Sequence, residues 1–327
     1  MAQTAFVTGG SGFIGGRLIR RLGGDGWSVR ALARSDRSAR AVEEAGATAA
    51  RGDLDDPDSL RDGAEGCEVF FHAAAYVEEW GSRADFERGN VEGTRNALDG
   101  ARGAGVRRFV HVGTEAAILA GEPLVDVDET APLRPDSKAL YPSTKAAAEQ
   151  LVRDASDGLE TVVIRPRLVW GPGDTTILPG LAEAVRSKKF AWIGGGTHRT
   201  STTHVDNVVE GLVLGAERGK PGEAYFVTDG EPVVFREFVT DLLATQGLEP
   251  PDRNAPRALV GALAAAGEGA WRLLPLPGAP PVTRMAFWLA ALDTTIDISK
   301  ARRELGYEPV ITRERGLAEL REAAAAA

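Results

Sequence analysis

The feature that most restricts how this chain can fold is a glycine-rich turn near its amino terminus. Gly9, Gly12 and Gly15 stand between the apolar run 5–8 and the amphipathic segment 17–22. Where a strand turns directly into a helix, glycines at this spacing let the backbone reverse tightly and let the helix pack close to the strand. The pattern therefore predicts a strand, a tight turn and a helix whose first amide groups face a common ligand.

Short runs rich in β-branched and aromatic residues recur along the chain at wide intervals. They cover residues 5–8, 28–32, 68–72, 108–112 and 161–165, and a shorter strand is expected just before Gly52. Helix-length amphipathic segments separate them, which is typical of parallel strands joined by crossover helices. Fully apolar runs such as 69–71 indicate strands that are covered on both faces. The expected fold class is α/β, with a doubly wound parallel Rossmann sheet.

The glycine turn opens a strand–helix–strand unit, and in that position it predicts a site for the pyrophosphate of a dinucleotide. The end of the second strand selects the dinucleotide, because an acid there binds the ribose of NAD whereas an arginine pairs with the 2′-phosphate of NADP. Arg34 stands at that position, with Asp36 and Arg37 close behind. We therefore expect NADP(H) to be favoured over NAD(H). The alternative is that Arg34 only covers a solvated strand end.

Further residues are expected around the same cofactor. Asp53 follows the third strand and could accept a hydrogen bond from the adenine amino group, while Ala73 and Ala74 follow the fourth strand and leave the backbone accessible. A helix cap and ordinary packing are the alternative roles. The predicted cofactor-binding residues are Gly9, Gly12, Phe13, Ile14, Gly15, Arg34, Asp53, Leu54, Ala73, Ala74, Lys145 and Pro166.

The regular alternation of strands and helices weakens after Pro166, where glycine- and proline-rich turns become frequent. The helix-like segment 205–216 and the strand-like segment 224–228 indicate a return to the first layer. We therefore predict two domains, of which the second is smaller, discontinuous and mostly helical. The dinucleotide-binding Rossmann domain comprises residues 1–166 and 205–230, and the substrate domain comprises residues 167–204 and 231–327.

Three polar residues are predicted to be catalytic. Tyr141 and Lys145 are four residues apart in a helix-like segment, so their side chains lie on one helix face. A nearby cation lowers the pKa of a phenol from its usual value of about 10, which makes the phenol usable as an acid or base. Thr114 stands just past the strand 108–112, at the sheet edge where ligands bind, and its hydroxyl could bond a substrate carbonyl. Ordinary surface and turn roles are the alternatives.

With these residues in place, the sequence resembles the extended short-chain dehydrogenase/reductases. The glycine turn 8–15, Thr114 and the pair Tyr141 and Lys145 match the TGxxGFIG, Ser/Thr and YxxxK motifs of that family. Two further segments resemble the 3β-hydroxysteroid dehydrogenase and dihydroflavonol reductase-like branch, namely 226–232 and 298–306. The resemblance implies that Tyr141 is the proton donor or acceptor, that Lys145 binds the nicotinamide ribose and tunes Tyr141, and that Thr114 orients the carbonyl.

The resemblance also suggests roles for three other polar residues. Asn90 would belong to a water relay or would hold the backbone near the site, and we weigh these two roles equally. His204 and Asp206 fall in a motif that more plausibly fixes the junction between the two domains than takes part in chemistry.

The substrate class must be inferred from the pocket, because the same fold serves reductases, sugar-nucleotide epimerases and dehydratases. Only one acid, Glu115, follows Thr114, whereas dehydratases of this family carry an acidic pair there. Leu168 stands where sugar-nucleotide enzymes tend to carry asparagine. We expect hydride transfer between NADP(H) and a secondary alcohol or ketone of a hydrophobic, steroid-, terpenoid- or aromatic-like substrate. The alternatives are a sugar-nucleotide epimerase and a non-catalytic NADP-binding sensor.

An apolar pocket is therefore expected beside the nicotinamide. Binding pockets are lined mainly by hydrophobic and aromatic side chains, and several of the tryptophans fall in loops or in the second domain. The alternative is that these tryptophans fill the core of the second domain. The predicted pocket residues are Trp80, Glu115, Leu168, Trp170 and Trp192, with the segment 271–288.

The composition excludes several classes of function. The 327 residues carry a formal net charge of −9, so the chain lacks the overall basic field that nucleic-acid binding needs. Its single cysteine, Cys67, cannot form an internal disulfide, and with four histidines it gives no cluster of the kind that holds zinc. We expect no metal site and no nucleic-acid partner. The sequence shows no basic, apolar leader, so we expect a cytoplasmic protein.

The most apolar stretch, 258–292, is interrupted by charged residues and prolines. No run in it reaches the roughly 18 apolar residues of a membrane span. Two interpretations stay open: the stretch lies on a membrane surface, or, as we favour, its helices cover a pocket. The helix-like segments 90–102 and 141–153 would either pair between two copies in a homodimer or pack within a monomer.

Overall fold

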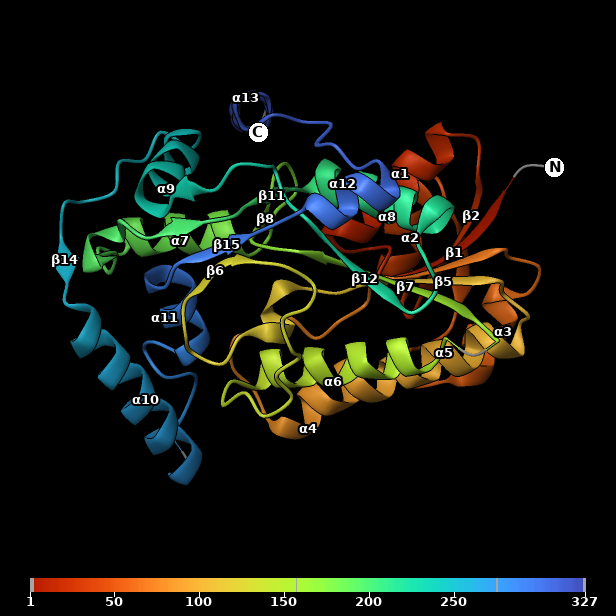
Figure 1. Cartoon of the computed structure of the whole chain (residues 1–327), viewed down its shortest axis with the longest axis horizontal. Helices are drawn as coiled ribbons and strands as arrows, with labels where there is room; N and C mark the ends of the chain where they lie inside the picture. Colours follow the sequence, from red (N-terminus) through yellow and green to blue (C-terminus); the bar gives the residue numbers. More distant parts are fainter. Residues whose placement is uncertain (1–2, 157, 275, 326–327) are drawn as a thin grey trace.

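A computed structural model of the chain describes residues 3–156, 158–274 and 276–325, and its centre is a sheet of seven parallel strands (Figure 1). The strands lie in the order β12, β7, β5, β4, β1, β2, β3. Their bounds are β1 (Thr4–Thr8), β2 (Ser28–Ala33), β3 (Thr48–Arg51), β4 (Val69–His72), β5 (Arg108–Val112), β7 (Glu160–Pro166) and β12 (Glu223–Val227). The strand order reverses between β1 and β4, and open parallel sheets bind ligands at the carboxyl edge of such a point.

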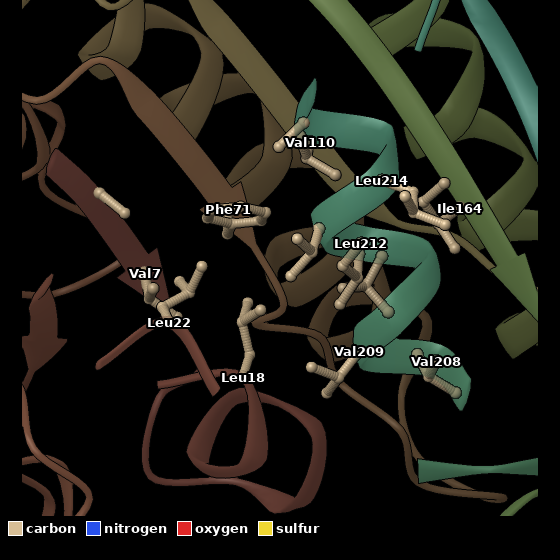
Figure 2. Close-up of a cluster of buried hydrophobic side chains, with 14 of the residues drawn as sticks. Val7, Leu18, Leu22, Phe71, Val110, Ile164, Val208, Val209, Leu212 and Leu214 are labelled. Atoms are coloured by element: carbon tan, nitrogen blue, oxygen red, sulfur yellow. The ribbon is translucent and has the colours of Figure 1, made fainter. Parts of the chain in front are cut away.

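Helices cover both faces of this sheet and form two cores with it. One face carries α1 (Phe13–Gly24), α2 (Asp36–Glu44), α8 (Val205–Arg218) and α12 (Ser299–Leu305), and the other carries α3 (Pro57–Ala64), α5 (Gly93–Gly103) and α6 (Leu140–Asp154). Figure 2 shows the first core, where side chains of α1 and α8 surround Phe71 of β4. Successive residues of a strand point to opposite faces, so Phe70 lies in the second core.

A second region lies beside the carboxyl ends of these strands. It contains a mixed four-stranded sheet of β13 (Val233–Val234), β10 (Arg199–Thr200), β15 (Thr294–Ile296) and β6 (Leu124–Val127), and two short strand pairs of β8 (Val169–Trp170) with β11 (Thr203–His204) and β9 (Trp192–Ile193) with β14 (Asn254–Ala255). Its helices are α7 (Ile177–Arg186), α9 (Phe235–Ala244), α10 (Arg257–Leu273), α11 (Arg284–Ala291) and α13 (Arg313–Ala325). None of the helices described combines the length and the apolar composition that crossing a membrane requires.

The structure confirms the α/β fold class and the parallel sheet that the sequence predicts, and β5 has the predicted bounds. The second region is less purely helical than expected, because it contains strands of two to four residues that are too short to show a periodic pattern. The segment 296–307, which the sequence analysis places in the substrate domain, packs through Ile296, Ile298 and Leu305 into the core of the seven-stranded sheet. The division into domains stays a prediction.

Candidate active site

One continuous cavity of about 1020 Å³ opens along the carboxyl ends of β1, β2, β4, β5 and β7. Its lining runs from the glycine turn to α11, and it includes every predicted catalytic and cofactor-binding residue: Gly9, Gly12, Phe13, Ile14, Gly15, Arg34, Asp53, Leu54, Ala73, Ala74, Thr114, Tyr141, Lys145 and Pro166. The volume lies at the upper end of the usual range for ligand pockets. The fold thus brings residues from the whole first half of the chain to one site.

The glycine turn packs too closely for any other residue at two positions. Gly9 has a φ of +70°, and a Cβ built on it would lie 2.6 Å from the amide nitrogen of Ala74. A Cβ on Gly15 would lie 2.2 Å from the carbonyl oxygen of Gly9. Gly12 precedes α1 and no side chain caps the first amides of that helix, so these amides are free to bind an anion.

We expect Gly15→Ala to lower both the thermal unfolding midpoint and the affinity for a dinucleotide. The added methyl group must displace the backbone at Gly9, and overpacking of this kind costs roughly 1–3 kcal/mol. Gly23→Ala in the same helix is the matched control, because a Cβ there meets no atom within 4 Å. The control should keep or slightly raise stability, since alanine is the better helix former. Equal unfolding midpoints for the two variants would contradict the expectation.

Arg34 lies at the far end of the cavity from Tyr141 and is exposed. The nearest acid in sequence, Asp36, is paired with Arg51 at 2.5 Å, so it does not neutralise Arg34. Asp53 also faces the cavity, although its Oδ1 accepts a hydrogen bond from the amide of Asp55 at 3.1 Å. Among the described residues, Arg34 therefore forms no ion pair, and one carboxylate oxygen of Asp53 accepts no hydrogen bond.

Thr114, Tyr141 and Lys145 meet where β5 ends against the first two turns of α6. Thr114 follows β5 and its hydroxyl accepts a hydrogen bond from the amide of Ala116 at 3.1 Å. The same hydroxyl donates to the Glu115 carboxylate at 2.9 Å. The three predicted catalytic side chains therefore line one wall of the cavity.

The electrostatics of Tyr141 differ from the sequence-based expectation. Burial raises the pKa of Tyr141 well above its usual value, the negative charge of Glu115 raises it further, and a hydrogen bond with Thr114 acts in the opposite direction. The spacing to Lys145 predicts a lowered pKa for Tyr141, but the ammonium group of Lys145 donates a hydrogen bond to a backbone carbonyl oxygen. Tyr141 is consequently protonated at neutral pH and can donate a proton.

Lys145 is 3% exposed, and its Nζ donates to the carbonyl oxygen of Val112 at 2.8 Å and lies 3.3 Å from Nε2 of His111. Burial lowers the pKa of Lys145 to about 8, against an opposing effect of Glu149. Burial beside Lys145 also lowers the pKa of His72 to about 3 and that of His111 well below its usual value. Lys145 is therefore the one cation in this group of three buried side chains.

We expect the affinity for NADPH to fall as the pH rises through about 8. Lys145 is protonated below this value and neutral above it, and only the ammonium form carries the positive charge that attracts the anionic cofactor. One linked proton changes affinity by at most about tenfold per pH unit. Fluorescence titration on both sides of this pH measures the effect, and Lys145→Arg, which keeps its charge, should remove the fall. An affinity independent of pH in the unaltered chain would contradict the role of Lys145.

Asn90 lies in a one-turn π-helix, Glu87–Glu92, a local irregularity that is frequent at functional sites. Its amide nitrogen donates to the carbonyl oxygen of Tyr76 at 3.1 Å and to the hydroxyl of Thr144 at 3.0 Å. Its carbonyl oxygen accepts from the amide of Tyr76 at 2.8 Å. These contacts correspond to the backbone-holding role, because they join the loop after β4 to α6 next to Lys145.

The predicted pocket residues separate into two groups. Glu115 and Leu168 line the cavity, and Trp80 lines a small adjoining pocket together with Tyr141. Trp170 and Trp192 are 0% and 2% exposed and lie in the core of the second region, as the alternative interpretation expected. Met285 and Ala286, from the predicted segment 271–288, also line the cavity. Other apolar lining residues carry no local signal in the sequence and were not predicted: Tyr76, Val77, Ile177 and Leu289.

Arg167 is a further residue that the sequence analysis missed. Its guanidinium is 1% exposed and pairs with the Glu115 carboxylate at 2.5 Å. It also donates to the hydroxyl of Thr200 at 3.1 Å. The pair holds the Glu115 carboxylate beside Thr114, so its charge is fixed close to Tyr141. The two residues are 52 positions apart, which no sequence motif reveals.

His204 and Asp206 join helices rather than facing the cavity. His204 caps α8 by accepting a hydrogen bond at Nδ1 from the amide of Asp206, at 3.2 Å. Asp206 pairs with Arg17 of α1 through both carboxylate oxygens, at 2.5 and 2.7 Å. Glu319 of α13 lies 4.0 Å from Nε2 of His204. The contacts therefore connect α1, α8 and α13, in keeping with the structural role that the sequence suggested.

The chain is similar to known oxidoreductases along nearly its whole length. Residues 6–257 match the 3-beta hydroxysteroid dehydrogenase/isomerase family. The 4-hydroxy-2-methyl-3-oxo-4-farnesyl-3,4-dihydroquinoline-1-oxide ketoreductase of Stigmatella aurantiaca is 48% identical over 319 residues, which are 97% of this chain and 96% of the relative. The 2-alkyl-3-oxoalkanoate reductase of Stenotrophomonas maltophilia is 37% identical, over 98% of this chain and 99% of the relative.

A solved structure has the same fold. The dTDP-glucose 4,6-dehydratase DesIV of Streptomyces venezuelae, with NAD and TYD bound, has a TM-score of 0.77 and 23% identity, and the match covers 98% of this chain and 96% of that one. At this level of identity the likeness shows the architecture and does not carry the activity of that enzyme to this chain.

Proposed function

Because the chain belongs to the 3-beta hydroxysteroid dehydrogenase/isomerase family, we propose that it is a ketoreductase that uses NADP(H) and acts on an apolar ketone or secondary alcohol. The chain is an oxidoreductase of the extended short-chain dehydrogenase/reductase type. The observation that carries the finer proposal is the continuous cavity that joins the glycine turn to Thr114, Tyr141 and Lys145.

The residues present fit a nicotinamide dinucleotide. The uncapped amides of α1 would hold the pyrophosphate. Gly9 lies close to the backbone that follows β4 and carries no side chain, so no side chain there would block the pyrophosphate. Lys145 would bind the nicotinamide ribose, and Pro166 also lines the cavity. When bound, the nicotinamide supplies or accepts the hydride.

The protein residues would orient the substrate oxygen and supply the proton. Tyr141 is protonated at neutral pH and faces the cavity, so its phenol donates the proton that a reduced carbonyl oxygen requires. The Thr114 hydroxyl would turn from the Glu115 carboxylate to the same oxygen and fix its position. Burial and Glu115 both favour the protonated form of Tyr141, which is the form that reduction of a carbonyl uses.

The preference for NADP(H) rests on Arg34. It is exposed at the cavity, and Asp36 beside it is engaged by Arg51. An arginine in that place pairs with the 2′-phosphate that NADP(H) carries and NAD(H) lacks. We also propose a cytoplasmic location, and we leave the monomer and the homodimer as alternatives.

The proposal of an apolar substrate rests on apolar side chains of the second region that line the cavity. Leu168, Ile177, Met285 and Leu289 are among them, and their side chains offer no partners for the hydroxyl groups of a sugar. Polar groups buried without partners cost roughly 1–3 kcal/mol each. The names of the two relatives above describe a farnesylated 3-oxo-dihydroquinoline oxide and 2-alkyl-3-oxoalkanoates, which are both ketones with apolar substituents.

The test is turnover of the full-length chain against a panel of steroid, terpenoid, aromatic and long-chain ketones, with NADPH and NADH supplied separately. We expect NADPH oxidation, followed by its absorbance, with one or more apolar ketones. UDP- and dTDP-sugars serve as competitors and should neither be converted nor quench tryptophan fluorescence saturably. Conversion of a sugar nucleotide without turnover of any ketone would identify an epimerase instead.

A further inference from the structure

One acid is buried in the wall of the large cavity. Among the described residues, Glu115 is the only acid of the cavity lining that is buried, at 3% exposed. Its carboxylate accepts two hydrogen bonds from side chains, one from the Arg167 guanidinium at Oε1 and one from the Thr114 hydroxyl at Oε2, the latter at 2.9 Å. Taking a carboxylate out of water is costly unless such donors compensate it. Each of the two oxygens therefore needs its donor.

Arg167 fixes the position of this carboxylate. Its guanidinium is 1% exposed and also donates to the hydroxyl of Thr200 in β10, at 3.1 Å. A guanidinium that is held on both sides keeps its carboxylate partner in one orientation. A second buried pair joins Arg165 to Glu149, but neither of these residues lines the cavity. Of the two pairs, only the one with Glu115 presents a carboxylate to a ligand.

A ketone in the site takes away one of the two donors. The Thr114 hydroxyl has a single proton, and a ketone oxygen can only accept hydrogen bonds. In the function proposed above, Thr114 turns this proton from Glu115 to the ketone oxygen. Oε2 of Glu115 then has no donor among the described residues, and a buried charged acceptor without a donor is strongly unfavourable. A substrate that carries its own donor at this point would restore the lost hydrogen bond.

We propose that the substrate is an α-hydroxy ketone and that Glu115 accepts the hydrogen bond of its hydroxyl group. This inference rests on the ketoreductase function proposed above. Oε2 lies 2.9 Å from the Thr114 hydroxyl oxygen, so the new donor must lie one hydrogen-bond length from Oε2 and close to the carbonyl that Thr114 holds. A hydroxyl group on the carbon next to the carbonyl meets both conditions.

The hydroxyl group that Glu115 binds is not changed by the reaction. The carbonyl carbon takes up a hydride from NADPH and the carbonyl oxygen takes up the proton of Tyr141, so the product is a vicinal diol. Glu115 transfers no proton in this scheme. It determines specificity, because it stabilises a bound ketone that has the neighbouring hydroxyl and disfavours one that lacks it.

The experiment compares three ketones of one carbon skeleton, namely the parent ketone, its α-hydroxy derivative and its α-methoxy derivative. Deoxybenzoin, benzoin and benzoin methyl ether form one series, and dodecan-6-one with its 7-hydroxy and 7-methoxy derivatives forms a second. The methoxy group withdraws electrons as the hydroxyl does but has no proton to donate. With the full-length chain and NADPH, we expect kcat/KM for the hydroxy ketone to exceed both others by roughly tenfold to 100-fold. Dissociation constants from tryptophan fluorescence titration, which needs no turnover, should follow the same order.

Glu115→Leu with Arg167→Met should lower this ratio to about one. Both residues are replaced together, because loss of Glu115 alone would leave the Arg167 charge buried without a partner. Removal of the Glu115 charge also changes the pKa of Tyr141, but this affects the three ketones alike and cancels in the ratio. The matched control is Glu149→Leu with Arg165→Met, which removes a buried pair outside the cavity lining and should keep the ratio.

Circular dichroism and the unfolding midpoint show whether each double variant is folded, and the comparison in the unaltered chain tests the substrate class without them. Equal kcat/KM values for the three ketones in the unaltered chain would overturn this inference and leave the ketoreductase in place. A preference that survives Glu115→Leu with Arg167→Met, or that is lost equally in the control, would remove Glu115 from substrate recognition. Absence of turnover with every ketone, in these series and in the larger panel, would reject the proposed function and this inference with it.

Discussion

Tyr141→Phe is expected to lower turnover by about 100-fold or more while leaving the affinity for NADPH nearly unchanged. The substitution removes only the phenolic oxygen, which we propose as the proton donor and which faces the cavity near Thr114. The ring remains packed against α11, so the cavity keeps its shape. Steady-state rates with the best ketone of the panel and a fluorescence titration with NADPH measure the two quantities separately.

Tyr76→Phe is the matched control for this loss. Tyr76 also lines the cavity, yet its ring packs on Phe86 and its hydroxyl lies away from Thr114, toward Gly81. The control should keep most of its turnover. A Tyr141→Phe protein with a near-normal kcat would remove Tyr141 from the mechanism, and equal losses in the two variants would indicate a general disturbance of the cavity.

Arg34→Asp is expected to reverse the cofactor preference, with NADPH binding weakened by roughly 100-fold and NADH bound equally well or better. A charge-assisted hydrogen bond contributes roughly 1.5–3 kcal/mol, and the new carboxylate also repels the 2′-phosphate. The same carboxylate can accept hydrogen bonds from the two ribose hydroxyls of NADH. Titration of each cofactor against the unaltered and altered chains measures the ratio.

Arg37→Asp makes the same charge change three residues later, in α2, where the residue does not line the cavity. Its effect should be small and nearly equal for the two cofactors. If the unaltered chain binds NADH as tightly as NADPH, Arg34 does not have the role given to it. If both variants lose affinity for NADPH to the same extent, the preference comes from the overall positive charge at this edge of the sheet.

The sequence was informative wherever the signal was local. The glycine turn, the strands and the spacing of Tyr141 and Lys145 each depend on a few adjacent residues. The structure places all of them where a parallel sheet that binds ligands at its carboxyl edge requires them. Thr114 could be identified because it follows a strand whose apolar run has clear ends. The regular crossover of parallel strands then brings these separate segments together without any further information.

The sequence was uninformative where contacts between distant residues decide the outcome. Trp170 and Trp192 were expected at the pocket, but an aromatic side chain in a loop has no local pattern that separates core from surface. The raised pKa of Tyr141 depends on burial and on Glu115, whose carboxylate is held by Arg167 from another strand. The ammonium of Lys145 was expected to act on Tyr141, yet it donates a hydrogen bond to the backbone carbonyl oxygen of Val112.

The small sheet of β13, β10, β15 and β6 has a consequence for how the molecule assembles. Strand β6 of this sheet follows shortly after Thr114 in the sequence, whereas its partner β15 lies close to the carboxyl end of the chain. The amide of Asp126 bonds to the hydroxyl of Thr295 across 169 positions of sequence. Contacts between such distant residues form slowly, because the intervening chain must first be ordered. A ribosome must therefore synthesise the chain at least as far as β15 before β6 can pair with it, whereas the last strand of the seven-stranded sheet, β12, ends at Val227.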